Sequence, residues 1–171
     1  MPRASSGNRV RFELAPSRVM VGTGGVADKL SSFFRDCRAE IAVSLNAPDD
    51  VRRTAIMPVN LRVPMAALRA AIKEHLPASR NVLFEYVLFD GVNDALEDAE
   101  LLAASLHLLG AAHLRCRVNV IPCNTGPDPR SRPPVPERVD AFVARLSGLG
   151  VTTLVRRLQG RDIGRACGQL A

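Results

Sequence analysis

The sequence contains few of the features that define secreted, membrane-spanning or disulfide-rich proteins. Its four cysteines in 171 residues are too few for a disulfide framework and favour a reducing compartment. No apolar run approaches the roughly 18 residues that a membrane-spanning helix needs, and residues 1–11 lack the apolar core of a secretory signal. The 12 glycines and 12 prolines follow no repeat, which excludes a collagen-like chain. We therefore expect a cytoplasmic protein, with an organelle as the alternative, and no membrane partner.

Lysine is also scarce, because only two of the 23 basic residues are lysines. Residues 1–114 are formally neutral, with 13 basic and 13 acidic side chains, so the net charge of +6 lies entirely in residues 115–171. Arginine has a planar fork that fits phosphate groups and stacks on bases. The arginine-rich end predicts a nucleic-acid-binding face, although a GC-rich genome alone would also exchange lysine for arginine.

Apolar runs and helical patterns alternate along most of the chain. A hydrophobic content of 47% is enough for one folded domain, preceded by a polar and poorly ordered lead-in at residues 1–17. The β-branched and apolar runs predict strands at 18–23, 40–45, 81–89, 114–122 and 152–157. Helical spacing and capping residues predict helices at 26–36, 65–76, 94–109, 136–148 and 162–167, with a short one between 49 and 58. We expect Asp49 and Asp50 to cap the short helix, and Asn93 or Asp94 to cap the helix at 94–109.

This alternation predicts an α/β fold with a mainly parallel sheet of about five strands and helices outside it. Ligand sites in such sheets lie just beyond the carboxyl ends of the strands. The residues at these ends are small or polar, namely those at 22–24, 44–46, 90–93 and 122–124. We therefore expect them to face one ligand site.

Five segments resemble the radical-SAM methyltransferases of the RlmN/Cfr family, which modify an adenine of large-subunit ribosomal RNA. They are SLNAPDD (44–50), PVN (58–60), FEYVLFDGVND (84–94), VNVIPCN (118–124) and RDIGRACGQLA (161–171). The last segment and the EYV…DGVND string are most similar to the RlmN branch, which also methylates some transfer RNAs. The resemblance covers residues 18–171 and implies the C-terminal half of the family, a fragment of a partial β/α (TIM-like) barrel.

The resemblance also implies S-adenosylmethionine (SAM) as cofactor and a cysteine that carries the transferred methyl group. That cysteine matches Cys167 in the closing CGQL string. The family's SAM pocket matches Ser44, Leu45 and Asn46, where Asn46 stands in place of the family's histidine. A further SAM contact, after the fourth predicted strand, matches Asn124.

The chain departs from the family in its metal chemistry. The CxxxCxxC signature that holds the family's iron–sulfur cluster is absent, because Cys37, Cys116, Cys123 and Cys167 do not have that spacing. The strand end that contributes a serine to SAM reads GTGG (22–25) here. We predict no metal site in this chain.

Two interpretations of the function remain after these departures. The chain is either a truncated, split or degenerate methyltransferase, with the cluster half supplied by an N-terminal partner chain, or a non-catalytic RNA-binding or scaffold domain. In both cases the first strand lacks the neighbour that the family's barrel would supply. We expect its edge to be covered by self-association, by a partner chain or by the alternating residues Val10, Phe12 and Leu14 of the lead-in. Ribosomal RNA is the expected partner, with transfer RNA as a second substrate, and Arg156 and Arg157 are the expected RNA contacts.

Three other residues carry weaker expectations. Glu85 lies among apolar neighbours in a predicted strand, so its carboxylate either points into a barrel lumen or pairs with an arginine. Cys116 and Cys123 are seven residues apart, which puts their side chains on opposite faces of one strand. They are therefore poor ligands for a common metal ion.

Overall fold

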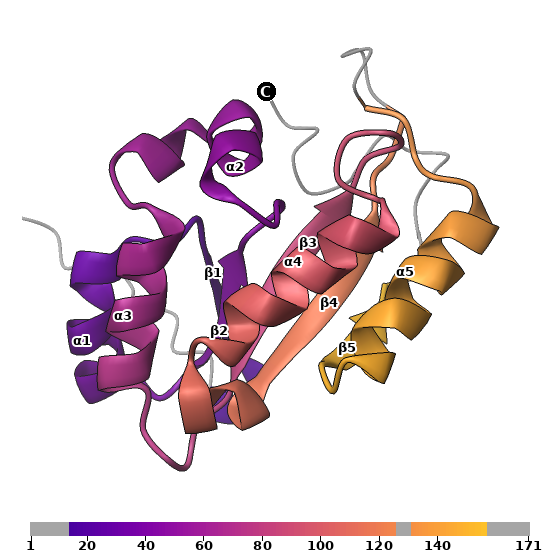
Figure 1. Cartoon of the computed structure of the whole chain (residues 1–171). Helices are drawn as coiled ribbons and strands as arrows, with labels where there is room; N and C mark the ends of the chain where they lie inside the picture. Colours follow the sequence, from indigo (N-terminus) through magenta and orange to yellow (C-terminus); the bar gives the residue numbers. More distant parts are fainter. Residues whose placement is uncertain (1–13, 126–130, 157–171) are drawn as a thin grey trace, which may run out of the picture.

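The computed structural model describes residues 14–125 and 131–156, which form an open α/β fold (Figure 1). Its strands are β1 (Met20–Thr23), β2 (Glu40–Ser44), β3 (Val82–Leu88), β4 (Cys116–Pro122) and β5 (Thr152–Val155). All neighbouring strands are parallel and follow one another in chain order. The sheet is not closed into a barrel, so the prediction of an open, parallel α/β fragment with five strands is confirmed.

Helices connect these strands. They are α1 (Ala27–Asp36), α2 (Asp50–Ile56), α3 (Met65–His75), α4 (Leu96–His107) and α5 (Pro136–Gly148). Parallel strands that are joined in chain order by right-handed crossovers have their crossover helices on the same face of the sheet. Accordingly, α1 packs against α3, and α4 packs against α5. The predicted helix at 162–167 and residues 1–13 of the predicted lead-in lie outside the described residues.

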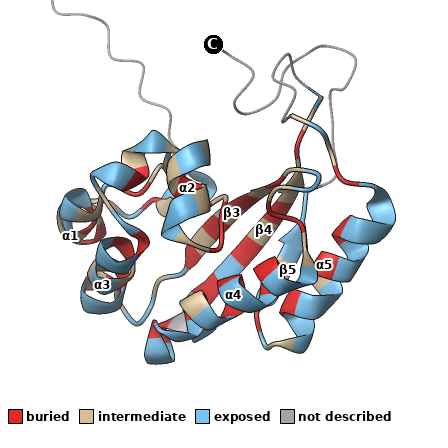
Figure 2. Cartoon of the chain, turned by 45° about the horizontal axis from the view of Figure 1, so that its top comes forward, coloured by how far each residue is buried: buried red, intermediate tan, exposed pale blue. Residues whose placement is uncertain are grey.

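Burial alternates along the inner strands, as Figure 2 shows for β3 and β4. Val82, Phe84, Tyr86 and Leu88 of β3 are at most 1% exposed, and the residues between them are half-buried. Successive side chains of a strand point to opposite faces of the sheet. The helices therefore cover one face and build the core there, and the other face, called the open face below, is less buried.

The starts of two helices show one correct and one wrong prediction. Asp49 caps α2, because its carboxylate accepts a hydrogen bond from the backbone N–H of Arg52 at 2.8 Å. Neither Asn93 nor Asp94 caps α4, which begins at Leu96 after Ala95. Asp98 accepts from the N–H of Ala95 at 3.1 Å instead, because Asn93 and Asp94 are hydrogen-bonded within the turn that follows β3.

The first strand has one neighbour among the described residues. Within the described residues β1 pairs with β2 alone, and its adjacent residues Met20 and Val21 are 53% and 39% exposed. Since adjacent residues lie on opposite faces, both faces of β1 are accessible.

None of the described helices is long and apolar enough to cross a bilayer.

Candidate functional site

Four of the predicted site residues lie at the edge of the sheet where its parallel strands end. Ser44 is the last residue of β2, and Leu45 and Asn46 follow it directly. On the other side of β3, the N–H of Cys123 donates to a carbonyl at the end of β3 (2.9 Å), and half-buried Asn124 comes next. The fold thus brings these two segments to one edge, on either side of the end of β3. We call it the carboxyl edge.

Asn46 has an unusual backbone and a fully engaged side chain. Its φ is 57°, in the left-handed region that side chains rarely adopt. Its amide oxygen accepts from the backbone N–H of Val87 at 3.0 Å, and its amide nitrogen donates to the sulfur of Met57 at 3.2 Å. The Asn46 side chain therefore ties the end of β2 to β3, and one N–H and one lone pair of its amide remain for a ligand.

Arg53 of α2 is fully buried beneath the carboxyl edge, and no sequence pattern predicts it as a site residue. The acceptors of its five N–H groups, at 2.7–3.3 Å, are the carbonyls of Gly24, Ser44, Leu45 and Val63 and the side chain of Asn60. Burial lowers the pKa of Arg53 from its ordinary value, an effect that nearby Asp50 opposes. This guanidinium joins the ends of β1 and β2 where the backbone ladder between them has stopped.

Asn93, which is fully buried, makes a second such connection. Its side chain accepts from the N–H of Phe89 at 2.7 Å and donates to the carbonyls of Asn46 (2.8 Å) and Val87 (2.7 Å). Its own carbonyl accepts from the hydroxyl of Tyr86 at 3.0 Å. Burial raises the pKa of Tyr86, so this hydroxyl remains a donor. The turn that holds Asn46 is fixed from both β3 and the β3–α4 loop.

A row of polar side chains crosses the open face next to the carboxyl edge. Ser44 of β2, Glu85 of β3 and Asn119 of β4 are aligned by the strand register, and all three are half-buried. Residues in register on neighbouring strands point to the same face. Glu85 makes no ion pair with any described residue, and the strand register puts it on the open face.

The described cysteines do not form a metal site. Burial raises the pKa of Cys116 to about 12 and that of Cys123 to about 11, with Asp90 adding to the effect at Cys123. Both are free thiols and are buried. Cys37 is also a free thiol and is half-buried. In residues 14–125 and 131–156, no group of three or more His, Cys, Asp or Glu side chains could hold a metal ion. These residues therefore do not fit an iron–sulfur cluster.

The remaining predicted residues lie at the end of the described chain or beyond it. Arg156 directly follows β5, is exposed and donates its backbone N–H to Val120 at 2.9 Å. Cys167 and Arg157 lie outside the described residues, so their positions relative to the carboxyl edge stay predictions.

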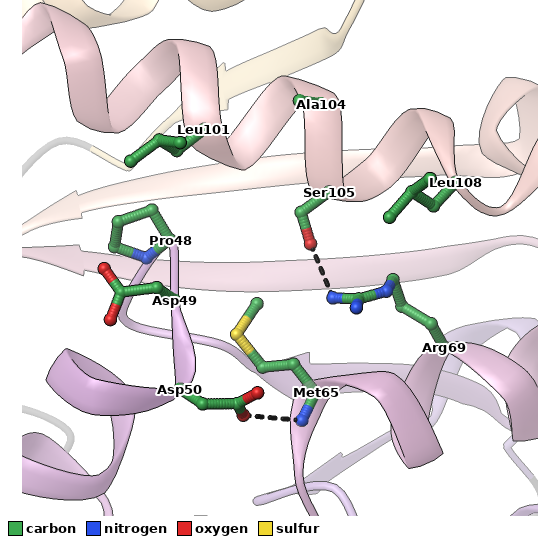
Figure 3. A pocket seen from close by; sticks show the side chains of 9 residues that line it. All are labelled: Pro48, Asp49, Asp50, Met65, Arg69, Leu101, Ala104, Ser105 and Leu108. Carbon is green, nitrogen blue, oxygen red and sulfur yellow. Dashed lines mark hydrogen bonds between the residues drawn. The ribbon is translucent and has the colours of Figure 1, made fainter.

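A shallow groove of about 350 Å³ lies away from the open face, between the start of α2, α3 and α4 (Figure 3). Its polar groups already have partners. Asp50 accepts from the N–H of Met65 at 2.8 Å, and Arg69 donates to Ser105 at 2.8 Å. Leu101 of α4 and Leu108, which directly follows α4, form its apolar wall. No residue predicted from the sequence as a ligand contact lines this groove.

Comparison with known proteins gives a consistent result. No family model matches the chain. The chain is 70% identical over 160 residues to a probable RNA methyltransferase of Sorangium cellulosum, which covers 94% of this chain and 39% of that protein. It is 42% identical over 154 residues to the dual-specificity RNA methyltransferase RlmN of Anaeromyxobacter dehalogenans, covering 90% of this chain and 40% of that one.

A solved structure shows the same relation. A radical SAM methyltransferase from Sphaerobacter thermophilus superposes with a TM-score of 0.81 at 41% identity, over 89% of this chain and 44% of that chain. The chain thus spans about two fifths of the length of the relatives that it matches.

Proposed function

The chain is homologous over about nine tenths of its length to part of the RlmN-type RNA methyltransferases, and from that premise we propose that it is the C-terminal portion of a radical-SAM enzyme that methylates adenine in RNA. The observation that carries this proposal is the extent of the match, 70% identity over 160 residues to a probable RNA methyltransferase. The convergence of the matching strand ends at one edge supports it. A cytoplasmic location follows from a ribosomal substrate.

In this proposal the carboxyl edge holds part of the SAM molecule. Ser44, Leu45, Asn46 and Asn124 occupy the positions that the family uses, and bound SAM supplies the methyl group. Asn46 contributes by shaping the turn, because its amide is bonded to Val87 and Met57. The polar, half-buried row on the open face is compatible with a polar cofactor at this place.

Cys167 is the residue that we propose to carry the methyl group on its sulfur. It is the cysteine of the CGQL string that resembles the end of the family's sequence. A thiolate is the reactive form of cysteine, and Cys116 and Cys123, whose raised pKa values keep them protonated at neutral pH, are unsuited to this role.

The cluster half of the enzyme has to come from further polypeptide, because the described cysteines do not fit a cluster. The edge of β1 is where we propose that it joins. An unpaired strand edge presents a row of backbone N–H and C=O groups to a new strand, and Met20 and Val21 leave both faces of β1 accessible. An N-terminal partner chain and an N-terminal extension of the same chain would both meet this requirement.

For RNA, we propose contacts through Arg156 and Arg157, with ribosomal RNA as the main substrate and transfer RNA as the second. Arg156 is exposed next to the carboxyl end of β5, which puts it beside the proposed cofactor site. The logarithm of the RNA affinity falls as the logarithm of the salt concentration rises. Removing one phosphate contact should make this slope shallower by about 0.7 on single-stranded RNA. A non-catalytic RNA-binding domain is the second candidate function, favoured by the absence of cluster ligands among the described residues.

One experiment separates these two functions. The chain is joined to the remaining three fifths of the Sorangium cellulosum relative, and the hybrid is expressed in a bacterial strain that lacks adenine-C2 methylation of ribosomal RNA. We expect mass spectrometry of the RNA to show the methylated adenine, and its loss in a hybrid with Cys167→Ala. A folded hybrid that binds RNA without methylating it would instead establish the non-catalytic function.

A further inference from the structure

The polar row Ser44–Glu85–Asn119 differs from its surroundings in what its carboxylate does. Three other buried or half-buried carboxylates near the carboxyl edge are bonded within the protein. Asp49 caps α2 and pairs with Arg52 at 3.0 Å, Asp98 pairs with Arg52 and caps α4, and Asp94 accepts from the N–H of Gly91 at 3.0 Å. Glu85 has no hydrogen bond or ion pair from its side chain to any described residue.

The absence of a partner for Glu85 is not explained by a lack of suitable neighbours. Arg117 lies on β4, two residues before Asn119, and therefore points to the same open face. Arg117 is exposed, and no ion pair joins it to Glu85. The oxygens of Glu85 are therefore not engaged by the described residues and can accept hydrogen bonds from a ligand.

The chemistry of the row restricts what it can bind. An ionised carboxylate only accepts hydrogen bonds, and the hydroxyl of Ser44 and the amide of Asn119 on either side can accept or donate. Neighbouring strands are about 4.8 Å apart, so the three groups span about 10 Å. A carboxylate repels phosphate but attracts hydroxyl and ammonium donors.

We propose that Glu85, with Ser44 and Asn119 beside it, is a ligand-binding carboxylate that accepts hydrogen bonds from the donor groups of an adenosyl ligand. The donors are the ribose hydroxyls or the ammonium group of its amino-acid part. This inference rests on the proposed function, because that function supplies an adenosyl cofactor at the carboxyl edge. It adds Asn119 to the cofactor site, and it gives Glu85, for which the resemblance implies no more than a lumen position near SAM, a specific ligand contact.

The test is an isosteric substitution, Glu85→Gln, with Glu40→Gln as matched control. Glu40 is also half-buried and lies on the same open face, but at the opposite end of β2. Titration calorimetry of the full chain with S-adenosylhomocysteine should show affinity about 10- to 100-fold weaker for Glu85→Gln, the range for losing a charged hydrogen bond. Glu40→Gln should bind as the unsubstituted chain does.

Two further ligands identify the donor. If the ribose hydroxyls bind Glu85, the substitution weakens adenosine but not 2′,3′-dideoxyadenosine. If the ammonium binds it, adenosine is unaffected and only S-adenosylhomocysteine is weakened. Either pattern supports the inference.

Thermal unfolding without ligand separates a binding role from a structural one. We expect Glu85→Gln to melt at the same temperature as the unsubstituted chain or higher, because no partner is lost. A lower melting temperature, or unchanged affinity for S-adenosylhomocysteine, would overturn the assignment of Glu85 and leave the proposed function standing. No binding by the unsubstituted chain would also overturn the assignment of Glu85, whereas the proposed function, in which further polypeptide completes the site, would be decided by the hybrid enzyme.

Discussion

On the face of the sheet that the helices cover, Val43, Phe84 and Val118 stand side by side and are at most 1% exposed. One residue further along the same strands, Ser44, Glu85 and Asn119 stand side by side on the open face and are polar and half-buried. The backbone and the strand register are identical for the two rows. The difference between them therefore reports what each face contacts, a hydrophobic core in one case and a polar site in the other.

The largest expected effect compares two adjacent residues of β3. Phe84→Ala removes a side chain from the covered face and should lower the free energy of unfolding by about 3–5 kcal/mol. Leu83→Ala, on the open face, should cost about 1 kcal/mol, because Leu83 is already half-buried beside solvent. Urea unfolding followed by circular dichroism measures both. Equal losses would mean that the open face is packed as tightly as the core.

The next effect concerns the carboxyl edge. Arg53→Met leaves the carbonyls of Gly24 and Ser44 and the side chain of Asn60 without their donor, so we expect a loss of about 3 kcal/mol. Arg62→Met is the control, because Arg62 is exposed, and a change within about 0.5 kcal/mol is expected there. If Arg53→Met is as mild as the control, Arg53 does not hold the strand ends together.

Sequence patterns predicted the open sheet well and the connections beneath its edge poorly. Strand and helix patterns are local, so the alternation of apolar runs was sufficient for five parallel strands. Arg53 bonds to Gly24, which is 29 residues away, and Asn93 bonds to Asn46, which is 47 residues away. Partners at such distances cannot be assigned from one sequence, and the mistaken cap at Asn93 has the same origin.

The environment of Glu85 is a second feature that could not be predicted from one sequence. The sequence indicated that a carboxylate in an apolar strand needs a reason, but it left a lumen position and an ion pair equally open. The strand register puts Glu85 between Ser44 and Asn119 on the open face, and none of the described arginines forms an ion pair with it.

A smaller effect is expected at the turn after β1. Gly25 has φ +94°, and an added Cβ would lie 3.1 Å from Leu68 and 3.3 Å from Arg53. Gly25→Ala should therefore cost about 2 kcal/mol. Gly22→Ala is the matched control, because nothing lies within 4 Å of its added Cβ, and its melting temperature should stay unchanged. A neutral Gly25→Ala would show that the strand end can shift without cost.

The smallest effect is a pH dependence from the buried thiols. The pKa of Cys123 is raised by burial from 9.0 to about 11, so the folded chain keeps a proton that the unfolded chain loses. Stability is therefore complete below about pH 9 and falls as the pH rises toward 11, by about 1 kcal/mol between pH 8 and pH 10 for this thiol. Urea unfolding of Cys123→Ala should show a flatter profile over that range. An unchanged profile would contradict the burial of the thiol.

The most direct test of the account locates the ligand on the molecule. Backbone amide spectra of the isotopically labelled chain are recorded during titration with S-adenosylhomocysteine. We expect the shifts to concentrate at the carboxyl edge, around Ser44, Asn46, Glu85 and Asn124, with none in the groove at Arg69, Leu101 and Ser105. Shifts centred on that groove, or a spectrum that ligand leaves unchanged, would contradict the claim that the open face and the carboxyl edge form an adenosyl-binding site.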